Sequence, residues 1–328
     1  MKLTRKKTTF LRIGLSILLL GILVYICDPR STWQYIRQAS LPQLAGTLLL
    51  FLASMPLIAW RWQILLKAKG MRISLMRLTR YYIVGFFFNN FMPSSIGGDI
   101  TRILNVSDHG YSLSDSFSCV FVERLIGFLA MALLAIGSLG FLLSHFQGAP
   151  LVIIITITLS FAFIILAWCC FHPAAFQRIS VFLKRLRWKK LGDKLHTVYS
   201  AIHAYRACPR ALLQTFAISL LYQFVMGVFV FWVARATGLT APFWMLFALM
   251  QVSSMAGILP ITLESAGIRE GIFLVILVNL GYTDSMVLAA IIMVRIISII
   301  GSSFGGVFLL AGDMHLPLSG RTSGEAAS

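Results

Sequence analysis

Six long apolar segments divide the chain of 328 residues and constrain its fold more than any other feature. They cover residues 10–26, 41–60, 117–143, 151–171, 211–234 and 285–311. A helix needs about 20 apolar residues to cross a hydrocarbon layer about 30 Å thick, and all six segments are close to this length or exceed it. Charged residues make up only 12% of the chain, about half the usual share of about 25% in globular proteins. The sequence therefore predicts an all-α polytopic membrane protein with six full spans.

Two shorter apolar segments adjoin sequences that break helices. Residues 81–92 form a helix of only about 18 Å, too short to cross alone. Pro93 then removes a backbone donor, and Gly97 and Gly98 allow the backbone to turn. In the second half, residues 243–259 lead into Pro260 and Gly267, and the short segment 272–280 follows. Because broken helices leave backbone groups unsatisfied, both stretches should line an enclosed cavity instead of facing lipid.

Basic residues give the orientation of these segments. Of the 28 Lys and Arg, 20 lie in the N-terminal segment, in a predicted loop over residues 61–80, in a central linker over residues 172–210, or in the tail. Cytoplasmic loops are enriched in these residues, so both termini are expected in the cytoplasm and the protein in the cytoplasmic (inner) membrane. The formal net charge of +17 fits orientation in an anionic membrane better than nucleic-acid binding.

This orientation turns the two broken segments into oppositely directed re-entrant hairpins. Residues 81–92 enter from the cytoplasm and return there, whereas residues 243–259 enter from the outside and return outside. Such an arrangement resembles an inverted repeat, in which broken helices meet near the bilayer midplane. The predicted organisation is a single transmembrane domain over residues 1–312, with halves at about 41–171 and 211–311, and a disordered cytoplasmic tail over residues 313–328.

Charged side chains accompany both hairpins and form the candidate substrate site. They are Asp99, Arg102, Glu123, Arg124, Arg269, Glu270 and Arg295. Each half has a carboxylate followed 25 residues later by an arginine, Asp99 with Arg124 and Glu270 with Arg295. Ionisable groups within a membrane are costly, so a function is the first interpretation and helix pinning by ion pairs is the alternative. With Glu264 included, four carboxylates stand against four arginines, and Arg124 and Arg295 are the best phosphate ligands because a guanidinium matches phosphate oxygens bidentately.

At these residues the chain resembles the flippase-like membrane proteins related to the transmembrane region of lysylphosphatidylglycerol synthase. That family carries a Pro…Gly-Gly-Asp…Arg stretch, a Glu-Arg pair, a Pro…Gly…Arg-Glu stretch and a further arginine. The matching positions here are Pro93, Gly97, Gly98, Asp99 and Arg102; Glu123 and Arg124; Pro260, Gly267, Arg269 and Glu270; and Arg295. One departure is that Glu264 and Ser265 stand where the family usually has a glycine pair. The resemblance covers roughly residues 40–310 and implies movement of an anionic or modified lipid between leaflets.

Two classes of function remain open. The first is a lipid transporter for an anionic, aminoacylated or polyprenyl-phosphate-linked lipid. The second is a membrane-embedded transferase or an accessory subunit of envelope glycolipid or phospholipid synthesis, with partner enzymes. The sequence has no ATP-binding motif, no metal-ligand spacing of Cys or His, and too short a tail for an aminoacyl-transferase domain. We therefore expect a non-enzymatic transporter without cofactor or metal, which could also form a homo-oligomer.

Overall fold

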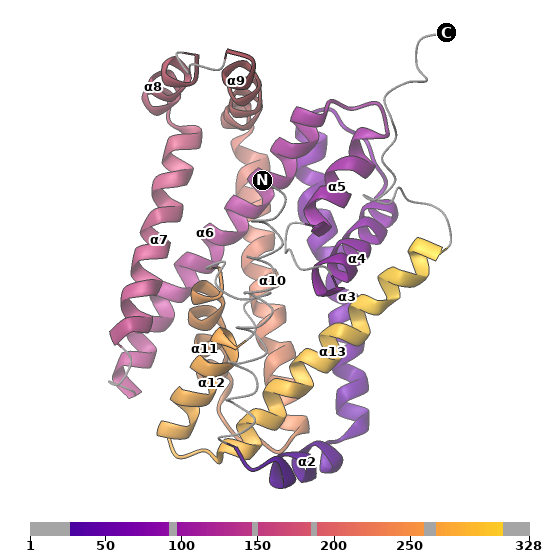
Figure 1. Ribbon diagram of the computed structural model, residues 1–328, viewed down its shortest axis with the longest axis vertical. Helices are drawn as coiled ribbons and strands as arrows, with labels where there is room; N and C mark the ends of the chain where they lie inside the picture. The colour runs from indigo at the N-terminus through magenta and orange to yellow at the C-terminus, as the bar shows by residue number, and fades with distance from the viewer. Residues whose placement is uncertain (1–26, 92–96, 146–149, 185–188, 259–266, 311–328) are drawn as a thin grey trace, which may run out of the picture.

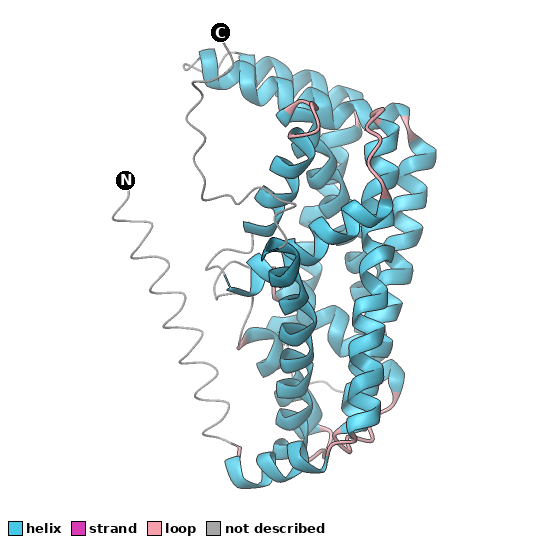
Figure 2. Ribbon diagram, turned by 90° about the vertical axis from the view of Figure 1, so that its right-hand side faces the viewer, coloured by secondary structure: helices cyan, strands magenta, loops and turns pink. Residues whose placement is uncertain are grey.

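The computed structural model describes residues 27–91, 97–145, 150–184, 189–258 and 267–310, and this part of the chain is built from helices (Figure 1). Their bounds are α2 Pro29–Gln38, α3 Leu41–Ala68, α4 Leu75–Phe91, α5 Gly97–Ser107, α6 Leu113–His145, α7 Pro150–Phe171, α8 Pro173–Lys184, α9 Lys189–His203, the short 3₁₀ helix η1 Ala204–Ala207, α10 Pro209–Ala236, α11 Phe243–Ala256, α12 Ile268–Asn279 and α13 Asp284–Leu310. The all-α prediction is thus confirmed for the described residues. Helices α3, α7 and α10 run close to the longest axis of the molecule, whereas α6 and α13 cross it obliquely (Figure 1). The described loops gather mainly at the two ends (Figure 2).

Five described helices are long and apolar enough to cross a membrane, namely α3, α6, α7, α10 and α13. They coincide with five of the six predicted spans, and the sixth, residues 10–26, lies outside the described residues. Only 11% of the most apolar 18-residue stretch of α7 is buried within the protein. Ile154, Phe161 and Ile165 of this helix are exposed. An apolar helix with so much exposed surface requires a lipid environment. The protein is therefore an integral membrane protein.

The predicted loop over residues 61–80 is wrong for most of its length. Helix α3 continues to Ala68 and α4 begins at Leu75, so only residues 69–74 connect the two. The helix continues because Arg61, which ends the apolar run in the sequence, is buried and ion-paired within the protein. The charge therefore has no need to reach the cytoplasm.

The two broken segments each form a pair of short helices. Helices α4 and α5 pack against each other, as do α11 and α12, and each pair is followed by a long helix, α6 or α13. Helix α4 begins six residues before the predicted segment, so that it includes Arg77, Thr79 and Arg80. Pro93 and Pro260 lie outside the described residues. Entry of these pairs into the membrane from opposite sides stays a prediction.

The basic central segment forms α8 and α9, which lie side by side at one end of the molecule (Figure 1). Tyr205 of η1 is buried, and its hydroxyl donates to the backbone oxygen of Leu65 at 3.1 Å. This contact attaches the central segment to the end of α3. Helix α9 ends at His203, and η1 continues the chain to Ala207.

Candidate functional site

The glycine pair after Pro93 serves a close helix crossing. Helix α5 begins at Gly97, and a Cβ atom on Gly98 would overlap the backbone oxygen of Gly85 in α4. The side chain of Asn89 accepts the Gly98 N–H at 3.0 Å and so satisfies one backbone donor at the start of α5. Neither Gly97 nor Gly98 is among the described glycines with positive φ, so here close approach, and not a left-handed backbone, requires glycine. This crossing fixes the position of Asp99 in the first turn of α5.

Asp99 and Arg124 form an ion pair between α5 and α6. The Asp99 Oδ1 atom accepts from Arg124 Nη2 at 2.9 Å and from Nε at 3.3 Å. Arg102 reaches the same oxygen at 3.4 Å from the next turn of α5. The Arg124 side chain is still 39% exposed, whereas that of Arg102 is 3% exposed. Of the arginines in the first half that the sequence singled out, Arg124 is thus the one that a ligand can reach.

Glu123 occupies a fully buried cluster beside this pair. Its Oε1 atom accepts from Arg61 Nη2 at 2.5 Å and from Nε at 3.0 Å, and it also accepts the Tyr82 hydroxyl. Its Oε2 atom accepts from Arg102. The cluster therefore joins α3, α4, α5 and α6, and it satisfies Glu123 and two buried guanidinium groups together.

Arg61 and Tyr82 are members of this cluster that the sequence interpretation missed. Arg61 Nη1 also donates to Ser219 of α10 at 3.2 Å, and Gly127 of α6 leaves room for its guanidinium. Arg102 lies over the ring of Tyr82, with 3.8 Å from its Cζ atom to the ring centroid. The apolar residues that follow Arg61 were the available signal, because they continue a helix beyond the arginine.

The second half repeats the carboxylate–arginine pair at its own helix start. Gly267 precedes α12 with a φ of 94°, a conformation that favours glycine. Glu270 turns back, so that its Oε2 accepts the Gly267 N–H at 2.8 Å. Its Oε1 accepts from Arg295 Nε of α13 at 2.9 Å, and the ion-pair distance from Oε1 to Arg295 Nη2 is 2.8 Å. Glu270 therefore caps α12 and joins it to α13 with a single carboxylate.

The two halves thus share one local arrangement. In each, a carboxylate in the first turn of a short helix, α5 or α12, binds an arginine 25 residues later in the following long helix. The two spacings in the sequence are equal, and the structure shows that both correspond to ion pairs. This local similarity favours the predicted internal repeat.

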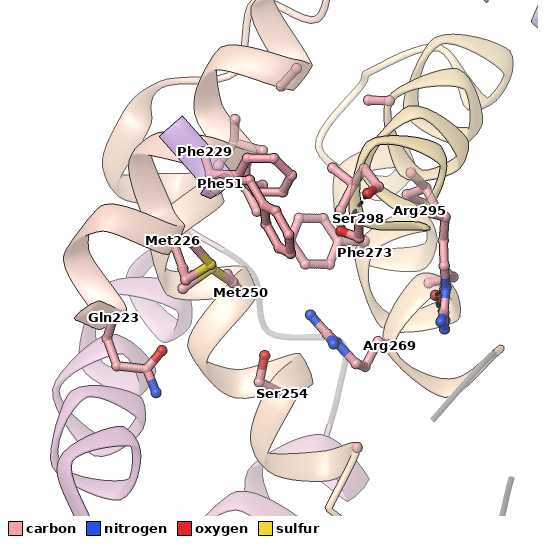
Figure 3. A pocket seen from close by; sticks show the side chains of 18 of the residues that line it. Phe51, Gln223, Met226, Phe229, Met250, Ser254, Arg269, Phe273, Arg295 and Ser298 are labelled. Carbon is pink, nitrogen blue, oxygen red and sulfur yellow. Dashed lines mark hydrogen bonds and ion pairs between the residues drawn. The ribbon is translucent and has the colours of Figure 1, made fainter. Parts of the chain in front are cut away.

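A cavity of about 520 Å³ brings residues of both halves together (Figure 3). Its lining comes from α3, α4, α6, α10, α11, α12 and α13. Charged lining residues among those described are Arg124, Arg269, Glu270 and Arg295, and the uncharged lining is rich in phenylalanine and methionine. Figure 3 shows the Arg269 guanidinium pointing into this space from α12. Asp99, Arg102 and Glu123 are not part of the described lining. Asp99 is nevertheless connected to the cavity, because it binds Arg124, which lines it.

Arg61 also changes the charge balance that the sequence predicted. Five arginines now stand against Asp99, Glu123 and Glu270 within the described residues. Glu264, outside the described residues, raises the number of carboxylates only to four. The predicted balance of four against four did not count Arg61, which the structure brings into the group.

Comparison with known protein families matches residues 9–306 to the model of the lysylphosphatidylglycerol synthase TM region. The chain belongs to this family. The match contains both carboxylate–arginine pairs and all residues of the described cavity lining, and it begins earlier than the resemblance at about residue 40 indicated. A comparison with curated proteins gives no match. Membership in the lysylphosphatidylglycerol synthase TM region family relates the chain to membrane lipid modification or transport.

Proposed function

We propose that the protein is a lipid transporter that moves a lipid with a phosphate-containing headgroup between the leaflets of the cytoplasmic membrane, with both termini in the cytoplasm. The observation that carries the proposal is the cavity within the membrane domain, lined by Arg124, Arg269 and Arg295. Guanidinium groups bind phosphate oxygens bidentately, and the apolar lining suits part of a lipid chain. The function uses no ATP hydrolysis or covalent chemistry of the chain itself.

The two ion pairs supply an exchange mechanism. The Glu270 carboxylate presents two oxygens to the Gly267 N–H and to Arg295, and a phosphate can offer two oxygens to the same donors. The Asp99 carboxylate holds Arg124 in a similar way. In the proposed mechanism the lipid phosphate displaces a carboxylate from its arginine, and the displaced carboxylate returns when the lipid leaves.

Two ion pairs in related positions would also allow the cavity to open to the two leaflets in turn. The first pair joins α5 to α6 and the second joins α12 to α13, so each short helix is attached to its long neighbour by one carboxylate. Exchange at one pair loosens that attachment while the other pair stays closed. Alternating release of this kind would open the cavity to one leaflet at a time, as in transporters built from inverted repeats.

Conservative arginine variants test the function in reconstituted vesicles. Lysine keeps the charge and loses the bidentate fork. We expect Arg124→Lys and Arg295→Lys each to lower the rate of lipid movement by about tenfold, the equivalent of about 1.4 kcal/mol in phosphate binding. Arg210→Lys is the matched control, since Arg210 is exposed at the start of α10 outside the cavity.

The outcomes separate transport from the alternatives. Recovery of chemically unaltered lipid in the opposite leaflet supports a transporter, whereas a modified lipid supports the transferase. Full transport by both lysine variants rejects phosphate clamping. Loss of the folded protein in both variants, measured by size-exclusion chromatography, supports ion pairs that only hold helices together.

A further inference from the structure

The lining of the cavity changes from polar to apolar along α10 and α11. On α10 it passes from Gln223 to Val230 in the direction of the chain. On α11 it passes in the opposite order, from Leu246 to Ser254. The two helices contact each other and are joined by residues 237–242, so they run antiparallel. Both polar positions therefore lie on the side of the cavity away from this connection.

Helices α12 and α13 repeat this order. Leu277 and Val287 line the cavity close to residues 280–283, which connect the two helices. Arg269 and Arg295 line it farther from the connection. One side of the cavity therefore suits a polar headgroup, and the side near the two connections suits a hydrocarbon chain.

Two neutral side chains on the polar side have hydrogen-bonding groups that are available to a ligand. Within the described part of the chain, the Gln223 amide and the Ser254 hydroxyl make no hydrogen bond, although both residues line the cavity. By contrast, the hydroxyls of Ser253 and Ser298 donate to backbone oxygens of their own helices, at 3.2 and 2.8 Å. Figure 3 shows the Ser254 hydroxyl pointing into the same space as the Arg269 guanidinium, with the Gln223 amide beside them.

The chemistry of these two groups matches that of sugar or glycerol hydroxyls. An amide offers two donor hydrogens and an acceptor oxygen, and a serine hydroxyl both donates and accepts. The hydroxyls of a polyol also donate and accept, so they can satisfy Gln223 and Ser254 together. A hydrocarbon substituent in the same place would displace water from both residues and replace none of its hydrogen bonds. The polar side thus favours a polyol next to the phosphate.

We infer that the cavity selects lipids whose phosphate carries an uncharged polyol, and that Gln223 and Ser254 are the residues that bind its hydroxyls. This inference rests on the proposed transport function and narrows its substrate. The phosphate lies on the arginines of the cavity, the polyol lies between α10 and α11, and an acyl chain follows the apolar lining. Glycerol and a ring polyol share this chemistry, and the experiment separates them.

A transport assay with lipids of equal charge tests the selectivity. The purified full chain is reconstituted in vesicles that contain labelled phosphatidylglycerol, phosphatidylinositol or phosphatidylpropanol. The propanol headgroup keeps the three carbons of glycerol and the charge of the phosphodiester but lacks the two hydroxyls. We expect the preferred polyol lipid to move at least about tenfold faster than phosphatidylpropanol, because a site that binds hydroxyls keeps unpaired polar groups when they are missing. The faster of the two polyol lipids identifies glycerol or a ring polyol.

Two variants assign the preference to its residues. Gln223→Leu and Ser254→Ala should each lower the ratio of polyol-lipid to phosphatidylpropanol movement by about threefold to tenfold, the effect of one lost hydrogen bond. Loss of a purely structural contact would slow all three lipids alike and leave this ratio unchanged. The matched controls Gln177→Leu and Ser303→Ala lie outside the described lining and should keep the ratio. Size-exclusion chromatography identifies the variants that fold, and either cavity variant alone is sufficient for the test.

The outcomes separate the selectivity from the transport function. Equal movement of phosphatidylpropanol and both polyol lipids overturns the selectivity while the transport function stands. An unchanged ratio in folded Gln223→Leu and Ser254→Ala proteins rejects the assignment of these residues. Movement of none of the three lipids rejects the proposed transport of phosphate-containing lipids and the selectivity with it.

Discussion

Replacing Glu123 by glutamine should be among the most destabilising conservative changes in this protein. Glutamine keeps the shape of the side chain and removes its charge. Glu123 is fully buried and binds Arg61 at 2.5 Å as well as Arg102 and Tyr82, so the variant leaves two buried guanidinium groups without their counter-ion. Asp99 also lies at 3.4 Å from Arg102, but it is already engaged by Arg124.

The magnitude follows from the burial of the partners. Removing one member of a buried ion pair costs about 3–5 kcal/mol, because the remaining charge stays desolvated. A total stability of about 5–15 kcal/mol means that this one change removes a third or more of it in most of that range. Tyr82→Phe deletes one hydroxyl donor and leaves both arginines paired, so its cost should be about 1.5 kcal/mol.

Equilibrium unfolding in detergent micelles measures these differences. A double variant, Arg61→Met with Glu123→Gln, removes one of the unpaired charges and should recover about 1–3 kcal/mol relative to the sum of the single variants. The reasoning is refuted if Glu123→Gln unfolds within about 1 kcal/mol of the unaltered protein, or if the two single effects simply add.

Two further predictions concern packing and orientation. Gly98→Ala should reduce stability by about 1–3 kcal/mol or prevent folding, since the added Cβ would overlap the Gly85 backbone oxygen, whereas Gly137→Ala in open space should show no such loss in the same unfolding assay. In a background without the five native cysteines, a cysteine at Gln177 should resist an impermeant thiol reagent applied to whole cells, and one at Gln147 should react. The opposite labelling pattern would reverse the proposed orientation.

The sequence alone determined much of the architecture. Long apolar runs predicted five of the described spanning helices because a membrane demands continuous internal hydrogen bonding over a fixed length. The charged residues of the site could be selected for a related reason, since ionisable groups within apolar segments are expensive and few. The equal spacing of Asp99 from Arg124 and of Glu270 from Arg295 also pointed to pairs that the structure contains.

Only the tertiary structure decided which charges meet and which face the cavity. The sequence predicts that Arg61 starts a cytoplasmic loop, because no neighbouring residue in the chain indicates that Glu123, 62 residues away, forms an ion pair with it. Glu123 and Arg124 are adjacent in sequence, yet one is fully buried and the other lines the cavity, because neighbouring helical residues point about 100° apart. Burial and pairing depend on how α3 to α6 pack together, and distant helices in contact leave no local pattern in the sequence.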